Sequence, residues 1–194
     1  GTLLWEPSEE QKANANITRY MAWLSETHGL EFTSYHALWD WSVSDLEGFW
    51  ASIWEFFDIK AHKPYTQVLS GRAMPGAQWF SGAQLNYTEH ALSRNDAHTA
   101  IEFRNEDGAA RTLSYRDLYH QVASVAAGLR RLGVMQGDRV AAYIPNIPEA
   151  VVAFLATASI GAVWSSCSPD FGARNVIDRF QQIKPTVLIT VDGY

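Results

Sequence analysis

Residues 138–171 read DRVAAYIPNIPEAVVAFLATASIGAVWSSCSPDF. The short apolar run from Val140 to Ile144 is typical of a strand that is covered on both faces. The segment from Ala150 to Ile160 is apolar almost all round and predicts a buried helix, with Gly161 as its left-handed C-cap. Residues 162–164 then begin a second strand. The stretch therefore predicts a right-handed β-α-β crossover between two parallel strands.

Helix-start residues support the buried helix, and a third strand follows further along the chain. Asn146 is expected to cap the buried helix, with Pro148 near its first turn. Glu149 then stands favourably against the positive end of the helix dipole. Further along, residues 186–191 read TVLITV and predict another strand, after Pro185 has ended the preceding helix. The α/β pattern thus continues beyond the quoted stretch.

The polar loop at residues 165–172 is the candidate functional segment. A parallel β-α-β unit delivers such a loop to the carboxyl edge of its sheet, where open α/β folds bind ligands. Ser168, which precedes Pro169, and Asp170 can each start the next helix, so we expect several backbone amides to point out of the loop. Function is therefore expected near Trp164 to Phe171.

Three further residues near this loop have two interpretations each. Cys167 is the only cysteine; with no histidine close in sequence to activate it, a small buried residue is favoured over a nucleophile. A single cysteine allows no intrachain disulfide, which is consistent with a reducing cytoplasm. Arg174 and Arg179 could meet a phosphate, but surface ion pairing is favoured for both.

Residues 1–96 predict a helical and loop-rich N-terminal appendage. Ser8 opens a capping-box pattern for a helix that runs to His28, and Ser44 opens a second one. The second helix carries an apolar stripe, for which core packing is favoured over an aromatic ligand platform. That stripe comprises Leu46, Phe49, Trp50, Ile53, Trp54 and Phe57. Residues 59–96 read as mainly loop, with a short helix near the end.

Residues 97–194 predict the first part of an α/β domain. Segments 99–104 and 110–113 flank an Asp-Gly pair and indicate a β-hairpin. Ser114 then caps an amphipathic helix that ends at Gly133. The expected fold class is α/β: a helical appendage, a β-hairpin and a parallel βαβαβ portion.

Composition and missing motifs exclude several classes of function. The net charge of −6 gives no reason to expect nucleic acid or an anionic membrane as a partner. No apolar run reaches membrane-spanning length, and the first residues lack the features of a signal peptide. The six histidines are scattered, so a metal site is not expected. The sequence has neither G-x-G-x-x-G nor G-x-x-x-x-G-K-S/T, which argues against a Rossmann dehydrogenase or a P-loop nucleotidase.

The stretch from Tyr115 to Gly172 resembles the N-terminal part of adenylate-forming acyl-CoA synthetases. Residues 74–87, MPGAQWFSGAQLNY, are similar to the entry segment of the acetyl-CoA synthetase subgroup. The matching positions in the longer stretch are Leu132-Gly133-Val134, Gly137-Asp138-Arg139-Val140, Asn146, Glu149 and Gly161-Ala162-Val163.

This resemblance implies a parent enzyme that activates a short carboxylic acid with ATP and Mg²⁺ and transfers it to coenzyme A. Similarity at residues 164–172 and 178–180 implies acetoacetate as the acid, with acetate and propionate as alternatives. The loop from Ser168 to Phe171 would lie near coenzyme A. The family's Ser/Thr/Gly-rich phosphate loop ending in Pro-Lys is absent from the sequence. We therefore expect an N-terminal part of a longer cytoplasmic enzyme, with no catalytic or metal-binding residue of its own and no activity alone.

A second hypothesis is a non-catalytic assembly module. Its exposed aromatic residues, together with its excess of acidic residues, would form a subunit interface. The protein would then associate as a homo-oligomer.

Overall fold

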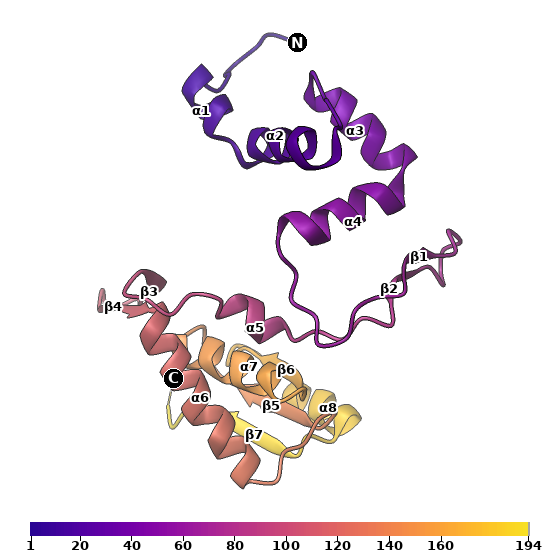
Figure 1. Ribbon diagram of the computed structural model, residues 1–194. Helices are drawn as coiled ribbons and strands as arrows, with labels where there is room; N and C mark the ends of the chain where they lie inside the picture. Colours follow the sequence, from indigo (N-terminus) through magenta and orange to yellow (C-terminus); the bar gives the residue numbers. More distant parts are fainter. Residues whose placement is uncertain (194) are drawn as a thin grey trace. The chain divides into compact units, whose positions relative to one another are not determined.

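The computed structural model describes residues 1–193, and the chain divides into two compact units (Figure 1). The first unit covers Gly1–Leu85 and the second begins at Asn86. The α/β fold class predicted from the sequence is confirmed: N-terminal helices are followed by antiparallel strand pairs and a parallel three-stranded sheet. The proposed domain limits at residues 96 and 97 stay a prediction. None of the helices between residues 1 and 193 combines the length and apolarity that a membrane crossing requires.

Four helices form most of the first unit: α1 (Glu9–Asn14), α2 (Asn16–His28), α3 (Tyr35–Ser44) and α4 (Leu46–Phe56). The capping box at Ser8 is confirmed. The single helix predicted as far as His28 is divided, because Ala15 has an extended backbone between α1 and α2. Helix α3 was not predicted. It occupies Ser44, so the start of α4 moves to Asp45, whose carboxylate accepts a hydrogen bond from the Gly48 N–H.

Aromatic packing holds these helices together. Tyr20 and Leu24 of α2 and Leu38 of α3 are buried, and partly buried rings from α4 surround them. The Tyr20 hydroxyl is hydrogen-bonded to the Ser52 hydroxyl of α4, which satisfies both buried polar groups. The predicted α4 stripe is core in part only: Phe49 and Ile53 pack inward, whereas Trp50 and Phe57 are exposed.

The passage predicted as loop contains a small antiparallel hairpin. Strand β1 (Gln67–Ser70) pairs with β2 (Gln78–Ser81). The predicted short helix is confirmed as α5 (Tyr87–Ala91), which belongs to the second unit. The Thr88 hydroxyl donates to the Leu155 carbonyl of α7 (Pro148–Ser159), and both groups are buried.

The second unit continues with the predicted hairpin and the long helix. Strand β3 (Thr99–Arg104) pairs with β4 (Ala110–Ser114), and α6 (Tyr115–Arg131) follows directly. Ser114 caps α6 through a capping box with Asp117, as its sequence predicts.

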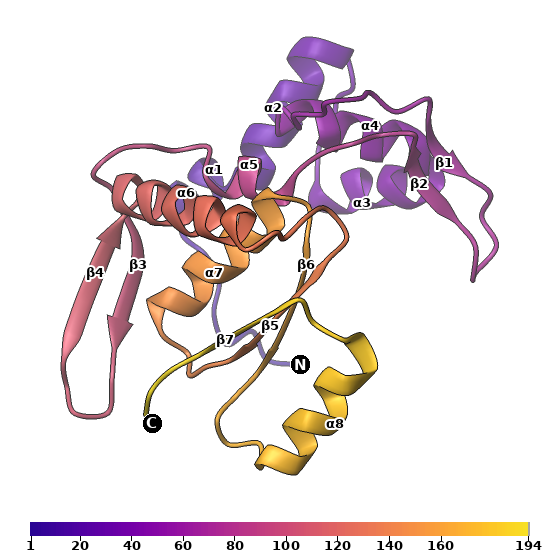
Figure 2. The same cartoon turned by 90° about the horizontal axis from the view of Figure 1, so that it is seen from below.

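A three-stranded parallel sheet forms the centre of the second unit. Its strands are β5 (Arg139–Tyr143), β6 (Val163–Cys167) and β7 (Val187–Thr190), in the order β6-β5-β7. Helix α8 (Ala173–Ile183) connects β6 to β7. Figure 2 shows α6 and α7 on one side of the sheet and α8 on the other. The predicted crossover between parallel strands is therefore confirmed.

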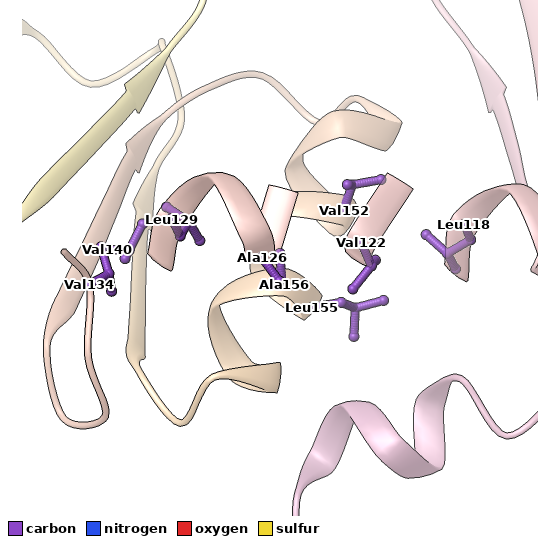
Figure 3. Packing of buried hydrophobic residues seen from close by; sticks show 9 residues of the cluster. All are labelled: Leu118, Val122, Ala126, Leu129, Val134, Val140, Val152, Leu155 and Ala156. Atoms are coloured by element: carbon purple, nitrogen blue, oxygen red, sulfur yellow. The ribbon is translucent and has the colours of Figure 1, made fainter. Parts of the chain in front are cut away.

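Alternate residues of β5 contribute to two separate cores. Val140 belongs to the larger core, between the sheet and helices α6 and α7 (Figure 3). Ala141 faces the other side and packs with Cys167 and with Val176 and Phe180 of α8. The buried members of the larger core are Leu118, Val122, Ala126, Leu129, Val134, Val140, Val152, Leu155 and Ala156.

The start of α7 corrects one expectation. Asn146 does not cap this helix; the N-cap residue is Ile147, which makes no side-chain hydrogen bond, and Pro148 occupies the first turn. Glu149, also in the first turn, forms a bidentate ion pair with Arg111 of β4, with N–O distances of 2.7 and 2.8 Å. Pro148 starts the helix without a polar cap because its φ is already helical and it has no N–H to satisfy.

Leu129 and Leu132 provide a test of the larger core. Leu129 is 4 % exposed in α6, whereas Leu132, at the C-cap of the same helix, is 67 % exposed. Leu129→Ala removes packed atoms and leaves a cavity, so it should lower the free energy of unfolding by about 2–5 kcal/mol. Leu132→Ala should lower it by less than about 0.5 kcal/mol. Urea unfolding followed by circular dichroism measures both; equal losses would contradict the assigned core.

The Arg111–Glu149 pair should make stability depend on pH. The hydrogen bond from Arg111 lowers the pKa of Glu149 from its ordinary value of 4.5, against a smaller opposing effect of burial. A carboxyl whose pKa is depressed on folding stabilises the fold above its unfolded-state pKa and loses this effect as the pH falls through the folded-state pKa. Glu149→Gln should therefore lower the Tm at pH 7, and the difference from the wild type should shrink as the pH falls below 4.5.

Glu106→Gln, in the exposed turn between β3 and β4, is the matched control and should leave the Tm unchanged at each pH. Thermal melts between pH 7 and 3 give the comparison. A difference for Glu149→Gln that stays constant over this range would refute the pH dependence.

Candidate functional site

The candidate loop lies where β6 leaves the sheet. Strand β6 continues past Trp164 to Cys167, so the loop begins at Ser168 rather than at residue 165. It ends at Gly172, the N-cap residue of α8. The Cys167 thiol is free and buried in the core beside α8, which confirms the packing interpretation of this residue. Parallel strands place the loop at the carboxyl edge of the sheet.

Ser168 and Asp170 hydrogen-bond to each other instead of capping α8. The Ser168 hydroxyl donates to the Asp170 carboxylate at 2.7 Å. Gly172 is the N-cap of α8 and offers no side chain, so the predicted caps are wrong. The N–H groups of Asp170 and Phe171 donate to the hydroxyl and the carbonyl of Ser168. These two amides therefore do not point out of the loop. The prediction of outward-pointing amides is wrong for both of them.

Tyr143, the last residue of β5, reaches the same loop. Its hydroxyl lies 2.9 Å from the Pro169 carbonyl oxygen and 2.9 Å from the Phe171 carbonyl oxygen. A hydroxyl has one proton to donate, so the two carbonyls share it. In the sheet register Tyr143 is paired with Cys167 of β6, which brings the phenol beside the start of the loop.

Arg179 holds the other end of the loop. Its guanidinium lies 4.7 Å from the centre of the Phe171 ring, which is a cation–π arrangement. In the part of the chain that the structure describes, neither Arg174 nor Arg179 forms an ion pair, so the favoured interpretation of these arginines is wrong. Helical geometry explains the contact, because Arg179 projects back toward the N-terminal end of α8.

A cavity of about 320 Å³ opens beside the loop at the carboxyl ends of β5 and β7. Of the four predicted residues, only Pro169 lines it. The remaining lining residues were not predicted from the sequence; they are Tyr143, Thr190, Val191, Asp192 and Gly193. Two signals could have found them: strand alternation puts Tyr143 on the α8 side with Ala141, and residues 190–193 follow a predicted strand that ends at the same edge.

Metal-binding groups do not gather here. Within residues 1–193, no three His, Cys, Asp or Glu side chains lie close enough together to hold a metal ion. The Asp170 carboxylate is engaged by Ser168. The cavity is lined by backbone and side-chain groups of residues 143, 169 and 190–193, and the exposed Phe171 ring stands in the loop beside it.

Known proteins match nearly the whole chain. Acetoacetyl-coenzyme A synthetase of Rhizobium meliloti (strain 1021) is 40 % identical over 191 residues, which are 98 % of this chain and 29 % of the relative. Acetoacetyl-CoA synthetase of Gallus gallus is 38 % identical over 195 residues, again 98 % of this chain and 29 % of the relative. The chain therefore spans about 29 % of the length of these curated relatives.

A solved structure shows the same fold. Acetoacetyl-CoA synthetase from Streptomyces lividans matches 100 % of this chain with a TM-score of 0.92 and 52 % identity, and the chain covers 31 % of that protein. The family model described as acetyl-coenzyme A synthetase N-terminus matches residues 35–91. The model described as AMP-binding enzyme matches residues 88–193, more than half of the chain. The chain therefore belongs to the AMP-binding enzyme family.

Proposed function

We propose that the protein carrying this chain is an AMP-forming acid–CoA ligase that acts on acetoacetate. The observation that carries the proposal is the continuous similarity to proteins named acetoacetyl-CoA synthetase, which extends through both units and reaches 52 % identity in the solved structure. The AMP-binding family supports the use of ATP and coenzyme A. Acetate and propionate are the alternative acids.

The reaction has two displacement steps. A carboxylate oxygen of the acid attacks the α-phosphorus of ATP, the bond from that phosphorus to the bridging oxygen breaks, and pyrophosphate leaves. The coenzyme A thiolate then attacks the carbonyl carbon of the acyl-adenylate, and AMP leaves with the carboxylate-derived oxygen. Both steps depend on orientation and on stabilisation of the charge that develops on oxygen.

In this reaction we assign the segment from Ser168 to Phe171 to the neighbourhood of coenzyme A. Support comes from its place at the carboxyl edge of the parallel sheet, beside a cavity, and from the exposed ring of Phe171. The described residues do not assemble a magnesium site, and no step assigned to this chain depends on one. ATP and Mg²⁺ belong to the proposal for the whole enzyme.

We also propose a reducing cytoplasm as its compartment, which the free and buried Cys167 supports. Association into a homo-oligomer stays a prediction; the exposed Trp50, Phe57 and Trp79 of the first unit are consistent with it.

The acid specificity can be measured with the full-length protein. Pyrophosphate release with ATP and coenzyme A should have a kcat/KM for acetoacetate at least about tenfold above those for acetate and propionate. In an enzyme specific for acetoacetate, groups that hydrogen-bond the keto oxygen would be left unpaired when acetate or propionate binds. A preference for acetate or propionate would replace acetoacetate in the proposal, and no release with any of the three acids would reject the ligase.

Asp170→Arg tests the place of the loop. This change reverses a charge and removes the Ser168–Asp170 hydrogen bond, so the KM for coenzyme A should change by about threefold or more. The KM for ATP should stay within about twofold of the wild-type value. Glu106→Arg makes the same charge change in the exposed turn between β3 and β4 and should alter neither KM. An unaltered KM for coenzyme A in Asp170→Arg would remove the loop from the coenzyme A site.

A further inference from the structure

The hydrogen bonds of Tyr143 fix the orientation of two peptide groups in the loop. The phenol hydroxyl lies 2.9 Å from the carbonyl oxygens of both Pro169 and Phe171, which are 26 and 28 positions further along the chain. The ring packs with the core beside α8, so it approaches the loop from the protein interior. Both carbonyls therefore point toward the Tyr143 side of the loop.

Because peptide groups are planar and trans, the orientation of these two carbonyls also fixes the N–H groups of the following residues. The N–H of each peptide points opposite to its C=O, so the N–H groups of Asp170 and Gly172 point away from Tyr143. The Asp170 N–H is taken by Ser168. The Gly172 N–H finds no acceptor within residues 1–193, and Gly172 is exposed, with no atom within 4 Å of the place where a Cβ would stand. The phenol thus determines which backbone groups the loop presents outward.

We infer that Tyr143 is a positioning residue for the coenzyme A step: its hydroxyl holds the loop from Ser168 to Gly172 in the shape that receives coenzyme A. This inference rests on the proposed function. Tyr143 itself does not touch the reacting atoms. Its ring contributes to the core beside α8, and its hydroxyl contributes the loop orientation, so the two contributions can be separated by removing the oxygen alone.

Tyr143→Phe makes this separation in the full-length enzyme. Phe171 is exposed and the partly buried Pro169 lines the cavity, so both carbonyls can accept hydrogen bonds from water in place of the phenol. The loop should then lose its fixed shape while the ring continues to pack. We expect the KM for coenzyme A to rise by about three- to tenfold, the factor that one neutral hydrogen bond supplies. The acid-dependent exchange of pyrophosphate into ATP, which needs no coenzyme A, should stay within about twofold of the wild-type rate, and the Tm should change by less than about 2 °C.

Tyr119→Phe is the matched control. Tyr119 lies on α6, is 43 % exposed and forms no hydrogen bond through its hydroxyl to any residue of the described part. The same loss of one oxygen there should leave the KM for coenzyme A, the exchange rate and the Tm unaltered. Any general effect of removing a phenol hydroxyl would appear in both variants.

The outcomes separate this inference from the proposal beneath it. An unaltered KM for coenzyme A in Tyr143→Phe, with a changed one in Asp170→Arg, overturns the positioning role and leaves the loop in the site. A changed KM in Tyr143→Phe with an unaltered one in Asp170→Arg overturns action through the loop. A parallel rise of all KM values with a fall in Tm shows a structural role only. Absence of pyrophosphate exchange in the wild type rejects the ligase, and the positioning role with it.

Discussion

The pairing of β5 with a parallel strand on each side is the interaction on which the second unit depends. Val140, Ala141 and Ala142 of this strand are all 0 % exposed, and their backbone groups bond to β6 and β7. The side chains are small enough for helices to pack closely on both faces. The position of the candidate site depends on this strand, because β5 sets the register of β6 and β7 and so determines where the following loops leave the sheet.

Local signals predicted the elements of this unit well. The apolar run of β5, the nearly all-apolar α7 and Gly161 define a crossover whose handedness is fixed by chain chirality. The hairpin at β3 and β4 and the cap at Ser114 are likewise short-range features. In these segments propensity, capping and hydrophobic period agree, and tertiary packing does not override them.

The predictions from sequence failed where contacts between residues far apart in the chain, or between side chains within a loop, determine the structure. Helix α3 has a weak pattern of its own and is fixed by Leu38, which packs into the core with Tyr20 and Leu24 of α2. In the loop after β6, Ser168 and Asp170 satisfy each other, although either side chain could have capped a helix. The role of Tyr143 depends on a contact with carbonyls 26 and 28 positions away, and no local pattern encodes it.

Arg139, at the start of β5, donates hydrogen bonds to the carbonyl oxygens of Ile183 and Lys184 at the end of α8. Tyr143, at the other end of β5, holds the loop before α8. Both side chains come from the same face of one strand. Strand β5 therefore holds both ends of the β6–β7 connection: the loop before α8 and the C-terminal end of α8. Coenzyme A, which we propose to bind beside this loop, would therefore meet a segment that is anchored at both ends. Conformational change on ligand binding should be confined to side-chain rotations such as that of Phe171, and the backbone of α8 should stay in place.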